Sequence, residues 1–154
     1  MTTAETNESV YRRINEEIWE KRNFDAVDDL IAEDYVLHDP SMPDDAEWSG
    51  GREGYREMVE MGTDVFEDAT IDIQQTISAD DYVIGRWSMT GTHVGEMGNV
   101  QPSNEEVTMT GIEISRFEDG KLAESWQEIN MLDMLTQAGE LPEDLFAPEM
   151  SADD

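Results

Sequence analysis

The stretch that decides the fold is Tyr82-Val83-Ile84-Gly85-Arg86-Trp87-Ser88-Met89-Thr90-Gly91-Thr92-His93, which is followed by two segments of the same kind, residues 107–117 and 122–129. β-branched and aromatic residues recur in all three segments between turn-forming residues, a pattern typical of strands. A loop with glycine and proline separates the first two segments, and Asp119-Gly120 suits a short hairpin between the second and third. The sequence therefore predicts three consecutive antiparallel strands.

Strands of this length need something to wrap around. About eleven residues at roughly 3.3 Å each approach 36 Å, and a twisted sheet of that length bends. The preceding half of the chain supplies helices, because Val10, Tyr11, Ile14, Ile18 and Trp19 repeat at helical spacing. They predict a helix over 7–22, with Thr6 or Asn7 as its cap. Further elements are expected in this order: a short helix at 25–31, a strand at 35–38, a helix over 55–66 and a strand at 70–77.

The remaining segments are turn-rich or polar. Residues 40–51 are expected to form an exposed loop that could close over a cavity, and 131–138 a short closing helix. The chain is long enough for one domain. We expect a single α+β pocket domain over residues 1–140 and an acidic C-terminal tail over 141–154.

Several short motifs resemble those of a known family in their order and spacing. They are Tyr35…His38-Asp39-Pro40, Arg86-Trp87…Gly91-Thr92-His93…Gly95-Glu96-Met97-Gly98…Pro102-Ser103, Gly111-Ile112…Arg116-Phe117-Glu118-Asp119-Gly120-Lys121 and Glu124…Trp126. Over roughly residues 8–138 the chain resembles the SnoaL-like polyketide cyclases, or ester cyclases, of the nuclear transport factor 2-like superfamily. The resemblance implies a cone-shaped, curved antiparallel sheet wrapped around about three helices, a central pocket for a small molecule, and commonly a homodimer formed through the outer sheet face.

The same resemblance implies a catalytic acid on the last strand, where the cyclases are described as using an aspartate as general acid and base. Here the segment after Trp126 is Gln127-Glu128-Ile129-Asn130, so Glu128 is its one carboxylate. Alternate residues of a strand share a face. If Trp126 faces the cavity, then Glu128 and Asn130 face it as well. We therefore expect Glu128 to be the acid or base, with His38 and Asn130 orienting or polarising oxygen atoms.

Histidines exchange protons near neutral pH, so both histidines are candidates. His38 is either a loop-edge residue bonded to the backbone or a residue that contacts the ligand. His93, at the end of a long strand, is either structural or in contact with substrate.

Other residues of the long strands have two interpretations each. Glu113 is either an exposed residue or, if it points inward beside Glu128, a carboxyl whose pKa is raised. Arg86 is either ion-paired with a strand carboxylate or directed at a substrate oxygen. Trp87 and Trp126 are expected to be core or, as cavity wall, to contact the substrate.

The charge of the chain is extreme. It has 38 acidic and 9 basic residues, a formal net charge of −29, and the acidic residues are spread over every segment. Such repulsion destabilises a compact state, but a Debye length near 3 Å at about 1 M salt removes most of it. The even spread predicts a halophilic protein with an acidic surface, working in a high-salt cytoplasm.

Composition also excludes several classes of partner and cofactor. The charge disfavours nucleic acid and anionic membranes, and there is no apolar run long enough to span a bilayer. The chain has no cysteine, and its two histidines lack zinc-ligand spacing. No glycine-rich phosphate loop is present. We expect no cofactor and no metal.

Two classes of function remain. One is an enzyme that performs acid–base chemistry, as an aldol-type cyclase or an isomerase, on an apolar carbonyl compound. The other is a non-catalytic binding or scaffold protein of the same fold.

Overall fold

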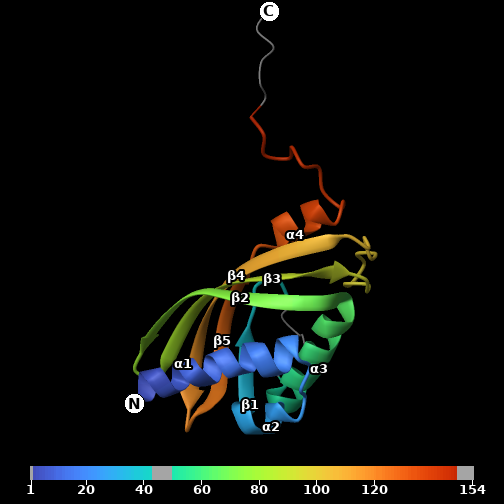
Figure 1. Ribbon diagram of the computed structural model, residues 1–154. Coiled ribbons are helices and arrows are strands. Elements are labelled where there is room, and N and C mark those ends of the chain that lie inside the picture. The colour runs from blue at the N-terminus through green and yellow to red at the C-terminus, as the bar shows by residue number, and fades with distance from the viewer. Residues whose placement is uncertain (1, 43–49, 149–154) are drawn as a thin grey trace, which may run out of the picture.

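The computed structural model describes residues 2–42 and 50–148 (Figure 1). The first half of the chain forms α1 (Thr3–Arg13), the π-helix η1 (Ile14–Glu20), α2 (Ala26–Leu30), β1 (Ile31–His38) and α3 (Gly51–Val65). The second half forms β2 (Phe66–Ala79), β3 (Tyr82–His93), β4 (Glu106–Glu118), β5 (Lys121–Ile129) and the short α4 (Met131–Gln137).

The strands form one sheet in the order β1-β5-β4-β3-β2. In Figure 1 the sheet curves over α1, and α2 and α3 lie on the same side of it. The α+β architecture expected from the sequence is confirmed. One expectation was wrong: β1 runs parallel to β5, so the sheet is mixed and not wholly antiparallel. A parallel pair cannot be joined by a tight turn, and here α3 and three strands connect β1 to its partner.

The first helix begins earlier than the sequence indicated. Thr2, rather than Thr6 or Asn7, caps it: the Glu5 backbone N–H donates to the Thr2 hydroxyl at 3.2 Å, and the Thr2 N–H donates to the Glu5 carboxylate at 2.7 Å. This reciprocal pair satisfies two N–H groups that would otherwise lack partners. Asn7 lies inside the helix and is buried.

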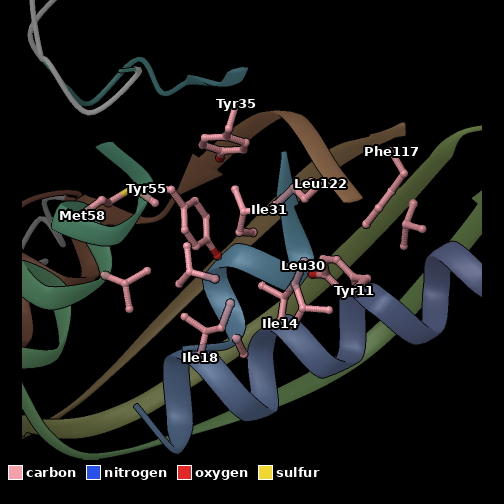
Figure 2. Packing of buried hydrophobic residues seen from close by; sticks show 14 residues of the cluster. Tyr11, Ile14, Ile18, Leu30, Ile31, Tyr35, Tyr55, Met58, Phe117 and Leu122 are labelled. Atoms are coloured by element: carbon pink, nitrogen blue, oxygen red, sulfur yellow. The ribbon is translucent and has the colours of Figure 1, made fainter. Parts of the chain in front are cut away.

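Two apolar clusters fill the interior. The larger one lies between the helices and one half of the sheet, and Figure 2 shows Tyr11, Ile14 and Ile18 of the first helical segment facing Ile31, Phe117 and Leu122 within it. The smaller cluster centres on Phe66, Trp87 and Met89 at the other end of the sheet, where Met134 of α4 joins it. The pocket described below belongs to the first cluster.

Element boundaries agree closely for the last three strands, and β3 spans the residues that the sequence predicts. β1 and β2 are longer than expected. Most of the predicted loop at 40–51, and the end of the predicted tail, lie outside the described residues. No helix in the described ranges is long and apolar enough to cross a membrane.

Candidate functional site

A hollow opens between the inner face of the sheet and the helices. It is small and partly open to solvent. The residues that line it come from six elements and are Tyr11, Ile14, Asn15, Trp19, Tyr35, Tyr55, Met58, Glu113, Ser115, Leu122, Ser125 and Gln127. Polar and apolar groups contribute to the lining in comparable amounts, and small-molecule sites combine apolar walls with a few placed polar groups.

The polar groups on the sheet side form two cross-strand pairs. Glu113 of β4 lies opposite Gln127 of β5, and Ser115 lies opposite Ser125. Because residues two apart on a strand share a face, all four side chains point to the same side of the sheet. They form a polar square on the floor of the hollow.

Aromatic side chains form the opposite wall. Tyr55 of α3 packs edge-on against Tyr35 of β1, with ring centroids 5.0 Å apart, and its hydroxyl accepts a hydrogen bond from Trp19 Nε1 at 3.0 Å. Figure 2 shows Tyr11, Tyr35 and Tyr55 converging on the interior from three different elements. These rings and the polar square enclose the space between them.

The change from α- to π-helix helps to orient this wall. Tyr11, Asn15 and Trp19 all line the hollow at intervals of four residues. In an α-helix four residues overshoot one turn by about 40°, so a run of such intervals drifts around the axis. The wider π-turn, seen where Lys21 N–H donates to Glu16 O at 3.1 Å, reverses that drift. Trp19 therefore returns to the face that carries Tyr11.

Two glycines make room for the aromatic wall. A Cβ at Gly85 of β3 would collide with the Tyr11 hydroxyl, and a Cβ at Gly62 of α3 would lie 2.9 Å from the Trp19 ring. Gly85 is also the cross-strand neighbour of Glu113. The Tyr11 hydroxyl thus lies over β3 next to that carboxyl.

Glu113 has an altered acidity. Its side chain is partly accessible because it borders the hollow, but dense protein surrounds it, and this desolvation raises its pKa above the usual 4.5. The Tyr11 hydroxyl partly opposes the rise by pointing toward the carboxylate, although the two do not reach full hydrogen-bond geometry. Burial likewise raises the pKa of Tyr11, Tyr35 and Tyr55, so all three phenols stay protonated at neutral pH.

Two hydroxyls of the hollow lack hydrogen-bond partners. In the described part of the chain, three buried side-chain polar atoms have none: Tyr11 Oη, Ser115 Oγ and His93 Nε2. The first two line the hollow. The third is distant from it along β3 and belongs with the smaller apolar cluster, since the His93 ring packs 5.7 Å from Phe66.

The expected orientation of the last strand was wrong. Gln127 and Ser125 face the hollow, whereas Glu128 and Trp126 point to the outer side of the sheet, where Trp126 is 36% exposed. Asn130 is exposed and caps α4 by accepting a hydrogen bond from the Asp133 N–H at 3.1 Å. None of Trp126, Glu128 and Asn130 lines the hollow.

His38 and Arg86 also lie on the outer face. His38 Nε2 is 2.7 Å from Glu124 Oε2, and the ring stacks on Trp126 at 5.1 Å. Arg86 donates to Gln74 Oε1 at 2.6 Å, and among the described residues it forms no ion pair, contrary to one of its two interpretations.

Trp87 and His93 are structural on the geometry found here. Trp87 is buried in the smaller cluster, with Gly111 leaving room for its ring. His93 is fully buried, and its Nδ1 accepts a hydrogen bond from the Ser103 N–H at 3.2 Å. Glu113 is thus the one sequence-predicted site residue that lines the hollow.

The lining residues that the sequence did not predict include three tyrosines and two serines. Tyr11 belongs to a predicted helical stripe, and Tyr35 and Tyr55 lie in predicted elements. Ser115 could have been found, because it shares a strand face with Glu113 at a spacing of two. Within residues 2–42 and 50–148, no three His, Cys, Asp or Glu side chains gather as metal ligands would.

The described residues form an α+β protein whose curved sheet and helices enclose a hollow (Figure 1). Residues 9–138 match the family model of the SnoaL-like polyketide cyclases, and the chain belongs to that family. Among proteins of curated function, none matches the chain.

Solved structures agree with this assignment. A proposed polyketide cyclase from Acidithiobacillus ferrooxidans is 27% identical, with 91% of this chain and 99% of that chain covered and a TM-score of 0.77. IdmH, a proposed polyketide cyclase from Streptomyces antibioticus, is 28% identical over 86% of this chain and 98% of its own, with a TM-score of 0.74. AclR from Streptomyces galilaeus, a proposed hydroxylase, shares the fold. It is 24% identical over 91% of this chain and 89% of its own, with a TM-score of 0.76.

Proposed function

We propose that this protein is an acid–base catalyst that acts on a small, uncharged carbonyl compound, and that Glu113 carries the proton. The observation that supports this most is that Glu113 is the one carboxyl among the described residues that line the hollow. Its raised pKa brings it nearer to neutrality, where a group can both take up and release a proton. Glu113 therefore takes the role that the sequence assigned to Glu128.

The chemistry follows from that role. The Glu113 carboxylate takes a proton from the carbon next to a carbonyl, the C–H electron pair forms a C=C bond, and the carbonyl π pair moves to oxygen. In an aldol cyclisation the enolate carbon then attacks a second carbonyl of the same molecule, and Glu113 returns the proton to the new alkoxide. In an isomerisation Glu113 returns it to a different carbon. No proton is gained or lost in either case.

The lining also favours an uncharged ligand. Among the described residues, the lining contains four aromatic residues and no lysine, arginine or histidine that could pair with an anion. Apolar rings and neutral hydrogen-bonding groups suit a largely apolar carbonyl compound.

Proton exchange gives a direct test. Wild-type protein is incubated in deuterated buffer with a panel of small cyclic ketones, and deuterium uptake next to the carbonyl is followed by NMR. We expect catalysed uptake, lowered by about 10²- to 10⁴-fold in Glu113→Gln. The matched variant Glu128→Gln alters an exposed carboxylate outside the hollow and keeps the wild-type rate. Equal rates in the wild type and Glu113→Gln would contradict the proposal.

A binding protein is the second candidate. It is favoured by Gln127, a neutral amide on the pocket face of the last strand, where the family resemblance implies an acid. If the protein only binds, some ketones should raise its melting temperature, but the protein should not accelerate deuterium uptake into any of them.

The outer sheet face is a proposed homodimer interface. An uncharged row crosses four strands in register, Ile77–Ile84–Ile114–Trp126, with His38 as its fifth member. In the next row, Arg86 and Glu128 flank Ile112, which is 51% exposed. A two-fold axis parallel to β4 would set each Arg86 opposite Glu128 of the partner subunit. Sedimentation should show a dimer in the wild type and a monomer in Ile112→Asp; a monomeric wild type would contradict it.

The charge supports a further proposal, adaptation to a high-salt cytoplasm. The melting temperature should be higher in multimolar potassium chloride than in low salt, because screening relieves the repulsion within the chain. An equal or higher melting temperature in low salt would refute this.

A further inference from the structure

Among the described residues, the hollow has two buried hydroxyls without a hydrogen-bond partner, and they flank the proposed proton carrier. Tyr11 is 2% exposed and Ser115 is 1% exposed, yet neither Tyr11 Oη nor Ser115 Oγ forms a hydrogen bond within residues 2–42 and 50–148. Buried polar groups are nearly always paired, because an unpaired one costs free energy. Exceptions that share one pocket call for a functional explanation.

The backbone fixes where these hydroxyls lie. Ser115 follows Glu113 by two residues on β4 and points to the same side. Tyr11 reaches over Gly85 on the neighbouring strand, directly across from Glu113. One hydroxyl therefore approaches the carboxyl along its own strand and the other approaches it across the sheet.

We propose that Tyr11 Oη and Ser115 Oγ donate hydrogen bonds to one oxygen atom of the ligand and hold it beside Glu113. This inference rests on the proposed function and deepens it: the oxygen is that of the carbonyl whose neighbouring carbon gives up a proton. As that proton leaves, negative charge develops on the oxygen, and donors already in place in a poorly hydrated site stabilise it. Burial keeps Tyr11 in its donor form.

The ligand class follows from the same chemistry. A compound that presents a partly charged oxygen on an apolar ring should bind best, as a phenol does. Phenols resemble the enolate in that respect and have no carbon-bound proton for Glu113 to move. Their binding can therefore be measured without any catalysis.

The experiment uses a series of substituted phenols of graded acidity, with the full chain in multimolar potassium chloride and binding measured by titration calorimetry. For the wild type we expect tighter binding as the phenol becomes more acidic, since its oxygen then carries more charge. Tyr11→Phe and Ser115→Ala should each weaken binding about tenfold, as expected for one lost hydrogen bond to a charged group. In both variants the affinity for phenols should depend less on the acidity of the phenol than it does in the wild type.

Ser88→Ala is the matched control, because Ser88 of β3 lies in the same sheet, paired with Thr110 of β4, but does not line the hollow. It should keep the wild-type dependence on acidity. Ser115→Thr, which restores a hydroxyl, should recover affinity and guards against a folding defect in the alanine variant.

The inference is overturned if no phenol binds the wild type, or if Tyr11→Phe and Ser115→Ala behave as Ser88→Ala does. Its failure can be told apart from that of the proposed function. Acidity-dependent binding without ketone exchange would refute the catalyst and leave the oxygen site. Ketone exchange without acidity-dependent binding of phenols would refute the oxygen site and leave the catalyst.

Discussion

Glu113 and Glu124 lie on neighbouring strands of one sheet, and the two faces of that sheet give them opposite properties. Glu113 faces the hollow, where desolvation raises its pKa. Glu124 faces outward, where a hydrogen bond from His38 at 2.7 Å and one from Arg116 at 3.1 Å lower its pKa. In a chain with 38 acidic residues, the direction of a side chain therefore matters more than its type.

The faces also reverse the usual distribution of polarity near the pocket. The inner face of β4 and β5 carries the polar square Glu113, Ser115, Ser125 and Gln127, whereas the outer face carries Ile112, Ile114 and Trp126. This arrangement suits a pocket on one side and a contact surface on the other.

The largest effect should come from placing the same charge on the two faces at adjacent positions. Ser115→Asp puts a second carboxyl beside Glu113 in a poorly solvated site, and we expect it to lower the free energy of unfolding by about 3 kcal/mol or more. Ile114→Asp, one residue away on the outer face, should cost about 1 kcal/mol. Denaturant unfolding measures both, and varying the protein concentration separates any loss of a dimer. Similar losses would contradict the assignment of faces.

The same reversal explains why the fold could be predicted from the sequence but the site could not. Strand positions followed from runs of residues such as those of β3, which do not depend on knowing which face is buried. The face of a strand that points to the interior is normally recognised by its apolar side chains. In β5 the large apolar side chain of Trp126 lies on the outer face instead. Assigning the Trp126 face of β5 to the cavity therefore placed the inferred site residues of that strand on the wrong side of the sheet.

Other parts of the site depend on contacts distant in sequence. The Tyr11 stripe predicted a helix, but only the packing of α1 over Gly85 shows that its hydroxyl reaches Glu113. The parallel pairing of β1 with β5 also brings Tyr35 to the hollow, and nothing local in the sequence indicates it.

Gly85→Ala should have the next largest effect. The added methyl group would collide with the Tyr11 hydroxyl and ring. Overpacking of this kind costs about 1–3 kcal/mol, and here the obstacle is a buried aromatic side chain with little freedom to move. A double-mutant cycle with Tyr11→Leu checks the cause, because the cost of the alanine should shrink once the ring is gone. An unchanged cost would place the strain elsewhere.

Glu113→Gln should change how stability depends on pH. Because the folded pKa of Glu113 is raised above the 4.5 of the unfolded chain, the wild type is stabilised by protonation below that pH and loses the contribution as pH rises through the folded pKa. Glu113→Gln has no carboxyl to ionise at this position, so its free energy of unfolding does not fall in this way. The difference between variant and wild type should therefore increase with pH above about 4.5, in favour of the variant. Thermal melts of both proteins across that range measure the difference. A constant difference would mean that Glu113 is well solvated.

Glu124→Gln should give the opposite slope with the smallest amplitude. Its folded pKa is lowered below 4.5, so its contribution is present above that pH and disappears as pH falls through the folded pKa. The variant should be less stable than the wild type at neutral pH by up to about 1 kcal/mol, because His38 and Arg116 are partly exposed partners. At acid pH the free energies of unfolding of the wild type and Glu124→Gln should become equal, and so should those of the wild type and Glu113→Gln. The sign at neutral pH distinguishes the faces: loss of the outer carboxylate destabilises the fold, and loss of the inner one stabilises it.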